Sequence, residues 1–178
     1  MIISYFRDEF PSAYVPTVLK NCTARVNIDN SSISLDVWDT TERDEYVYSR
    51  TPAWSNADVF IVCYSIGEPT SLDNVAKKWL PEIRRLCANA PFLLVGTKAD
   101  LRSDKKLSED DTLADFGTAG REGQEHRAAC VMECSALTGV GLREVFDKAT
   151  RVALTKRYGS EQLPVATNAH KVPPQVAH

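Results

Sequence analysis

Alternating apolar and polar positions near the start of the chain predict a β-hairpin. In residues 33–38, every second side chain is apolar, which is typical of a strand with one buried face. Residues 23–28 form a weaker strand just before it. The polar residues 29–32 between these segments are typical of a tight connection, so the two strands are expected to pair.

Continuous apolar runs further along the chain predict a second kind of strand. Residues 59–64 and 92–95 are short and almost wholly apolar, and residues 129–134 are a less clear candidate. Such runs are typical of strands buried on both faces, as in a parallel sheet covered by helices.

Segments with apolar residues three and four positions apart predict helices between and after these runs. Residues 71–87 follow this spacing, with Pro81 expected to kink the helix or mark a boundary. Residues 142–153 predict a C-terminal helix. Strands alternating with helices favour an α/β domain with a mainly parallel sheet. We place this domain at residues 1–158 and expect 159–178, which contain prolines and no periodicity, to be a disordered tail.

Composition and charge exclude several classes of function. The chain has 178 residues with a net charge of -3, which gives no reason to expect nucleic-acid binding. No apolar run approaches the roughly 18 residues of a membrane span. None of the five cysteines forms a C-x-x-C pair, which indicates reduced, mostly buried thiols and a cytoplasmic protein. They are Cys22, Cys63, Cys87, Cys130 and Cys134.

Polar loops follow three of the predicted strands. They are residues 96–100, residues 133–138, and Asp39 with Thr40. Ligands of parallel α/β sheets bind at the carboxyl ends of the strands. These loops therefore predict one shared site.

Two of these loops resemble the base-reading motifs of Ras-type GTPases. Thr97-Lys98-x-Asp100 resembles [NT]-K-x-D, and Ser135-Ala136-Leu137 resembles S-A-[KL]. The resemblance implies that the Asp100 carboxylate accepts hydrogen bonds from guanine N1–H and the exocyclic amine, a donor pair that adenine lacks. It also implies that Lys98 packs its stem along the ring and that the second loop binds guanine O6 through a backbone N–H. Read alone, Lys98 and Asp100 would fit a solvated loop equally well.

Further segments resemble Rho and Rac proteins in particular, and the likeness runs over residues 1–158. The weakest stretch is 103–128, where Rho proteins carry an insert helix that we do not assign here. The matching segments are 10–18, 78–83, 95–102 and 144–146.

By this resemblance, residues 10–18 would form the effector-binding switch I loop, with Tyr14, Val15, Pro16 and Thr17 as switch and effector residues. Thr17 would bind Mg²⁺ through its hydroxyl, and Asp39 would hold the metal through water. Phe10 would lie against the edge of the guanine. The implied cofactors are GTP or GDP and Mg²⁺.

The phosphate-binding side departs from the family pattern. No G-x-x-x-x-G-K-[ST] string occurs, and residues 1–5 resemble the later half of the helix that follows it. The fold expected is thus a P-loop NTPase-like three-layer domain whose first strand and P-loop are missing. In the second switch, Glu42 and Arg43 stand where the family has Gly and Gln. Arg43 cannot accept a hydrogen bond from the attacking water, so no catalytic residue is assigned.

The resemblance implies a GTP-binding signalling switch with protein effectors and regulators, often acting on the cytoskeleton. The chain ends without a C-a-a-X box, so no stable membrane anchor is expected. Two alternatives stay open. One is a pseudo-GTPase that binds partners without nucleotide. The other is a truncated fragment that does not fold, since each buried unpaired backbone group costs about 1–3 kcal/mol.

Overall fold

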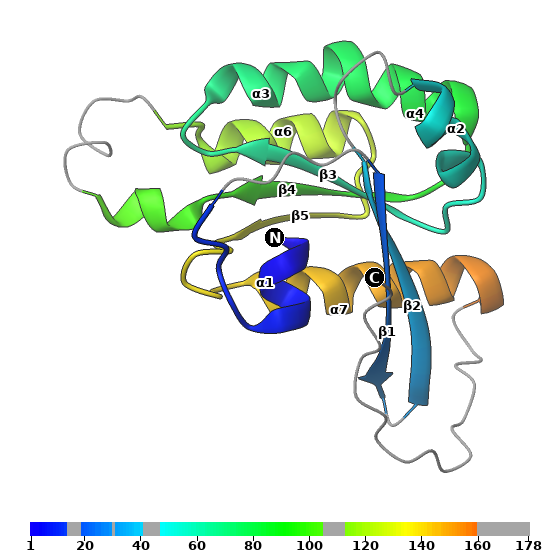
Figure 1. Ribbon diagram of the computed structural model, residues 1–178. Helices are drawn as coiled ribbons and strands as arrows, with labels where there is room; N and C mark the ends of the chain where they lie inside the picture. The colour runs from blue at the N-terminus through cyan, green and yellow to red at the C-terminus, as the bar shows by residue number, and fades with distance from the viewer. Residues whose placement is uncertain (14–18, 30, 41–46, 105–112, 160–178) are drawn as a thin grey trace.

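A computed structural model describes residues 1–13, 19–29, 31–40, 47–104 and 113–159. Within these residues, helices cover both faces of a three-stranded parallel sheet, and a two-stranded ribbon lies beside it (Figure 1). The α/β class predicted from the sequence is confirmed.

The ribbon is the hairpin predicted near the start of the chain. Strand β1 (Leu19–Ile28) pairs antiparallel with β2 (Ser31–Thr40), and Ile28 lies opposite Ser31 at the closed end. Both strands are longer than predicted, so residues 31 and 32 belong to β2 rather than to the turn. Asp29 in the turn takes a φ of 47°, the left-handed conformation that Asp tolerates better than most residues.

The parallel sheet contains the three apolar runs. Its order is β3 (Phe60–Ser65), β4 (Phe92–Thr97) and β5 (Cys130–Cys134). The central strand β4 is buried over almost its whole length, which explains why its sequence shows a continuous apolar run rather than alternation.

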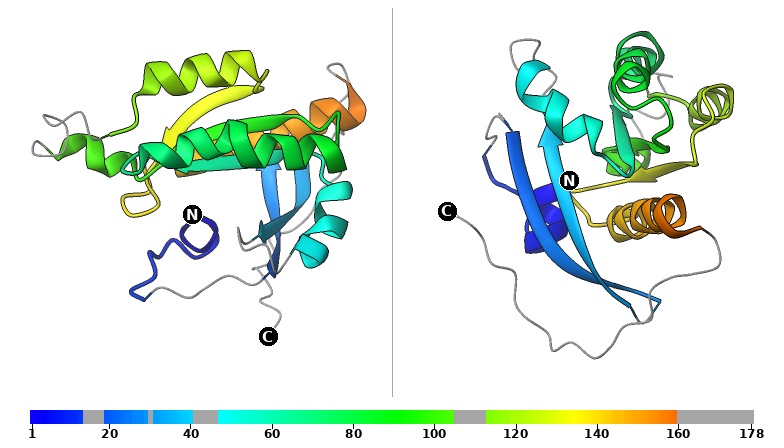
Figure 2. Two further views of the ribbon diagram at one scale, coloured as in Figure 1. Left: turned by 90° about the horizontal axis from the view of Figure 1, so that it is seen from above. Right: turned by 90° about the vertical axis from the view of Figure 1, so that its right-hand side faces the viewer.

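Two hydrophobic clusters fill the spaces on either side of this sheet. On one face, Phe92 and Leu94 pack with residues of α3 (Pro69–Asn74), α4 (Leu80–Leu86) and α6 (Phe116–Glu125). On the other face, Leu93 and Val95 pack against α7 (Leu142–Tyr158). The views in Figures 1 and 2 show the resulting helix–sheet–helix layers.

The short helix α1 (Ile2–Arg7) lies on the α7 side of the sheet (Figure 1). The ring of Tyr5 stacks on Phe146 of α7, with centroids 3.9 Å apart. The Met1 sulfur lies 3.6 Å from the sulfur of Cys134, at the end of β5. Aromatic stacking and sulfur contacts thus hold the start of the chain against the core.

The predicted helix at 71–87 is interrupted. Residues Val75–Trp79 form a π-helical turn between α3 and α4, in which the Leu80 N–H donates to the carbonyl of Val75. Pro81, which has no N–H, follows in the first turn of α4, so the predicted boundary at this proline is confirmed.

Among the described residues, helices α2 and α6 were not predicted from the sequence. Helix α2 (Val47–Ser55) contains Pro52 and shows little apolar periodicity. Helix α6 lies in the stretch 103–128, for which the sequence predicts no helix. Its start is marked by Asp115, whose carboxylate accepts a hydrogen bond from the Thr118 N–H at 2.7 Å. This Asp-x-x-Thr capping pattern was the signal that could have predicted it.

The two sheets do not pair with each other within the described residues. In Figures 1 and 2 the β1–β2 ribbon runs across the direction of β3–β5. Contacts to α7 connect it to the rest of the domain, including the Arg151 guanidinium, which binds both carboxylate oxygens of Asp29.

The thiols are less buried than predicted. All five cysteines are free, but only Cys134 is buried, and Cys63 on β3 is exposed. Cys63 lies on the opposite face of β3 from the buried Val62 and Tyr64, and the described residues leave this part of that face uncovered. No helix in the described part of the chain is long and apolar enough to cross a bilayer.

Candidate guanine-binding site

The first base-reading loop follows β4 directly. Thr97, the last residue of the strand, donates its hydroxyl to the carbonyl of Tyr64 on β3 at 2.8 Å. Lys98 then takes a left-handed conformation (φ 63°, ψ 41°) and begins a 3₁₀ turn, Ala99–Ser103. The Lys98 side chain is exposed, while Asp100 is only partly so. The sharp reversal thus brings Asp100 back over the end of the sheet.

The second loop follows β5 and is held by the buried Ser135. The Ser135 N–H donates to the carbonyl of Val140 at 2.8 Å, and the Gly139 N–H donates to the carbonyl of Ser135 at 2.9 Å. The Ser135 hydroxyl oxygen accepts a hydrogen bond from the Thr138 N–H at 3.1 Å. These bonds close a compact loop on which Ala136 is partly buried and Leu137 is 59% exposed.

Gly141 allows the second loop to join α7. Its φ of 70° is left-handed, and a Cβ there would lie 2.5 Å from the Glu133 carbonyl oxygen. Only glycine fits this combination of conformation and close approach.

A side-chain hydrogen bond joins the two loops. The Ser135 hydroxyl donates to Oδ1 of Asp100 at 2.5 Å. Since each carboxylate oxygen has two lone pairs, this bond orients the carboxylate and leaves acceptor positions on both oxygens. The two motifs predicted to share a site therefore lie in contact.

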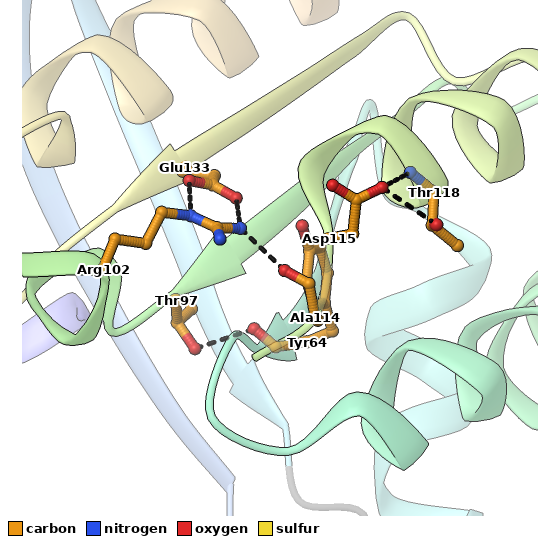
Figure 3. Close-up of polar contacts among 7 residues, drawn as sticks. All are labelled: Tyr64, Thr97, Arg102, Ala114, Asp115, Thr118 and Glu133. Carbon is orange, nitrogen blue, oxygen red and sulfur yellow. Dashed lines mark hydrogen bonds and ion pairs between the residues drawn. The ribbon is translucent and has the colours of Figure 1, made fainter. Parts of the chain in front are cut away.

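A second polar connection lies beside the loops and was not predicted. Arg102 donates from Nε to Glu133 Oε2 at 2.7 Å and from Nη2 to Oε1 at 2.5 Å (Figure 3). The same Nη2 donates to the Ala114 carbonyl at 2.8 Å. The hydrogen bonds to Glu133 raise the pKa of Arg102, so it stays charged. Both residues stand inside the motif strings, but their pairing depends on the register of β4 and β5.

Gly96 makes room for this connection. It lies opposite Tyr64 on β3 and Glu133 on β5, and a Cβ there would lie 2.7 Å from the Tyr64 hydroxyl and 3.2 Å from Glu133 Cγ. The Tyr64 hydroxyl is buried and has no hydrogen-bond partner among the described residues. Burial raises the pKa of Tyr64 to about 12.

Known proteins show the family to which this arrangement belongs. A model of the Ras family matches residues 1–155. The human Rho-related GTP-binding protein RhoB is 39% identical over 168 residues, which cover 90% of this chain and 85% of RhoB. The mouse and rat RhoB proteins match to the same extent. The chain is a Rho-type small GTPase domain of the Ras family.

The remaining predicted residues of the Rho-type domain lie on other elements of the described structure or outside the described residues. Phe10 is 50% exposed. Asp39 lies near the end of β2, on the ribbon rather than on the three-stranded sheet. Tyr14, Val15, Pro16 and Thr17 lie outside the described residues, as do Glu42, Arg43 and the predicted tail from residue 160 onward.

The polar groups present fit one part of a guanine nucleotide. Proteins of this family use GTP, GDP and Mg²⁺. The described residues supply an oriented carboxylate, an exposed Lys stem and a compact loop, which fit the base. No group of three or more His, Cys, Asp or Glu residues suited to a metal occurs in the described ranges. The metal ligands implied by resemblance, Thr17 and Asp39, therefore stay predictions.

Proposed function

We propose that this Rho-type domain binds guanine nucleotides through its base-reading loops and does not hydrolyse GTP by the mechanism of its family. The observation that supports the proposal is the hydrogen bond between Ser135 and Asp100. It orients the base-reading carboxylate in the absence of ligand, so less conformational freedom is lost on binding.

In this proposal each loop reads a different edge of the base. The Asp100 carboxylate accepts from guanine N1–H and from the exocyclic amine. A backbone N–H of the Ser135–Leu137 loop donates to O6, and the Lys98 stem covers one ring face while its ammonium remains in solvent. A hydrogen bond to a charged group contributes about 1.5–3 kcal/mol, which is about 10- to 150-fold in affinity. Loss of the exocyclic amine should therefore weaken binding by about that factor.

The second half of the proposal depends on residues of the second switch. Glu42 would bring a carboxylate towards the γ-phosphate, which is repulsive. Arg43 has five donors and no acceptor, so it cannot orient water for attack as the family Gln does. Thr17 and Asp39 stay the proposed Mg²⁺ ligands.

The experiment is a titration of chain 1–178 with fluorescent GDP and GTP, with and without Mg²⁺. GDP, inosine diphosphate and ADP serve as competitors, because inosine lacks the exocyclic amine and adenine lacks the whole donor pair. The proposal expects competition in the order GDP, inosine diphosphate, ADP, and no phosphate release from GTP. Equal competition by all three, or no saturable binding, would overturn it.

The variant Asp100→Asn tests the proposal through an expected gain of binding to a different base, xanthine. An amide offers one acceptor and one donor in place of two acceptors, which matches xanthine and mismatches guanine. We expect the variant to prefer xanthosine diphosphate over GDP. If the variant binds xanthosine diphosphate and GDP equally weakly, Asp100 does not contact the base.

A second candidate is a protein-interaction module that works without nucleotide, which the Glu42 and Arg43 substitutions favour. In either form the proposed partners are effectors and regulators of Rho-type GTPases, often linked to the cytoskeleton. The proposed location is the cytoplasm, supported by the free cysteines. Effector capture that ignores GTP and Mg²⁺, by a chain that unfolds cooperatively, would support this second candidate. Loss of capture when nucleotide is removed would reject it.

A further inference from the structure

The side chain of Arg102 joins chain segments from all three strands of the parallel sheet. It binds Glu133 at the end of β5 and the Ala114 carbonyl, while its own backbone belongs to the turn after β4. The Ala114 N–H in turn donates to the carbonyl of Ile66, just after β3, at 2.8 Å. One guanidinium thus connects the carboxyl ends of β3, β4 and β5.

This connection spans the same two loops that form the proposed base site. Arg102 follows Asp100 in the same 3₁₀ turn, and Glu133 precedes Ser135 at the end of β5. The Arg102–Glu133 pair and the Ser135–Asp100 bond are therefore two parallel links between one pair of loops. A bidentate guanidinium–carboxylate pair fixes both the separation and the angle of the groups that carry it.

The pair is more sheltered than the ion pair between Arg157 and Asp58. The side chains of Arg102 and Glu133 are 32% and 17% exposed, compared with 58% and 39% for Arg157 and Asp58. Reduced exposure lessens screening by solvent, so the geometry is held more firmly than at an exposed pair. The absence of a side chain at Gly96 leaves the space in which Glu133 lies.

We propose that Arg102 is a positioning residue for guanine recognition, which holds the two base-reading loops at the separation that lets Ser135 orient Asp100. This inference depends on the proposed function for its consequence in nucleotide binding. The loop geometry itself can be tested without nucleotide.

The first test measures amide hydrogen exchange in chain 1–178 carrying Arg102→Met. The amides of Thr138 and Gly139, which donate to Ser135, should exchange at least 10-fold faster than in the unchanged chain. The matched control is Arg157→Met, which breaks the exposed pair with Asp58 and should leave these amides unchanged. Unaltered exchange in Arg102→Met would overturn the inference.

The second test measures the ratio of affinities for GDP and inosine diphosphate. If Arg102 acts through the orientation of Asp100, Arg102→Met should reduce this ratio to less than threefold. If Arg102 has only a structural role, the variant should lose affinity for both nucleotides equally. The ratio of the two affinities would then be unchanged, which would overturn the inference. Binding of neither nucleotide by the unchanged chain would instead refute the proposed function, and hydrogen exchange would then decide the positioning role alone.

A conservative variant covers the case in which Arg102→Met does not fold. Arg102→Lys keeps the charge beside Glu133 but cannot make two parallel bonds to the carboxylate and a third bond to Ala114. We expect the amides of Thr138 and Gly139 to exchange faster in this variant than in the unchanged chain. Exchange rates identical to those of the unchanged chain would show that the bidentate geometry is not needed and would reject the proposal.

Discussion

The buried hydroxyl of Tyr64 leads to a prediction that runs against the usual effect of core mutations. Tyr64 is 2% exposed, and its hydroxyl has no hydrogen-bond partner among the described residues. A buried hydroxyl without a partner costs about 1–3 kcal/mol. Tyr64→Phe removes this group and keeps the ring, so the free energy of unfolding should increase by about that amount.

Thermal and urea unfolding of chain 1–178 measure this change. For a domain of this size each kcal/mol shifts the melting temperature by about 2–4 °C, so the expected increase is about 2–12 °C. The urea m-value should not change, because the same surface is exposed on unfolding. The control is Tyr158→Phe, at a residue that is 50% exposed, which should alter stability by less than about 0.5 kcal/mol.

The neighbouring Gly96 provides a check on the same geometry. A Cβ there would lie 2.7 Å from the Tyr64 hydroxyl, so Gly96→Ala should destabilise the domain by about 1–3 kcal/mol. Combined with Tyr64→Phe the penalty should be smaller, since the closest clashing atom is gone. Destabilisation by Tyr64→Phe alone would refute the reasoning, because it would show that the hydroxyl makes a favourable hydrogen bond.

Three further predictions concern the loops, α6 and the ribbon. Gly141→Ala should destabilise the domain by at least about 1 kcal/mol more than Gly139→Ala in urea unfolding, because both residues have positive φ but only Gly141 lacks space for a Cβ. Equal effects would contradict this. Hydrogen bonds from Thr118 lower the pKa of Asp115, so Asp115→Asn should reduce the melting temperature at pH 7. A carboxyl whose pKa is lower in the folded than in the unfolded protein stabilises the fold at pH values above the unfolded pKa. This stability is lost as the pH falls through the folded pKa. The difference in melting temperature between Asp115→Asn and the unchanged chain should therefore vanish at pH values below the folded pKa of Asp115. A difference that persists at this low pH would argue against a charge effect. Arg151→Met should speed amide exchange in β1 and β2 while leaving β4 unchanged, since Arg151 binds Asp29 at the tip of the ribbon. Equal acceleration in β4 would show that the two sheets open together.

Much of the fold could be predicted from apolar spacing because burial dictates it. The runs at 59–64 and 92–95 became β3 and β4, and the alternation at 33–38 became β2. Helix α6 was missed because it contains several glycines, which are poor helix formers. One of them, Gly123, lies so close to β5 that a Cβ would be 2.3 Å from a Val131 methyl carbon. Packing against the sheet, rather than helix propensity, therefore explains this helix, and a single sequence does not reveal such packing.

Some contacts of the proposed base site could be predicted from the sequence and others could not. Asp100 and Ser135 stand in short motifs at strand ends, so their meeting followed from the sheet topology. The partnership of Arg102 with Glu133 depends on which residue of β5 lies opposite Gly96. Because a shift of one residue would turn Glu133 to the other face of the sheet, register cannot be deduced from local pattern alone.

The separation of the two sheets affects how the proposed functions can combine. The base-reading loops extend from β4 and β5, which are hydrogen-bonded neighbours, whereas Asp39 lies on the ribbon, which no strand pairing joins to them in the described structure. The ribbon is held instead by side-chain contacts, such as the pair of Arg151 with Asp29 and the packing of Val37 against the cluster beneath α7. Loss of the ribbon contacts should therefore leave recognition of the base intact. It should weaken Mg²⁺ binding, because the implied metal site needs Asp39. Weakening the ribbon contacts should therefore reduce the effect of Mg²⁺ on nucleotide affinity and leave the preference for guanine unchanged.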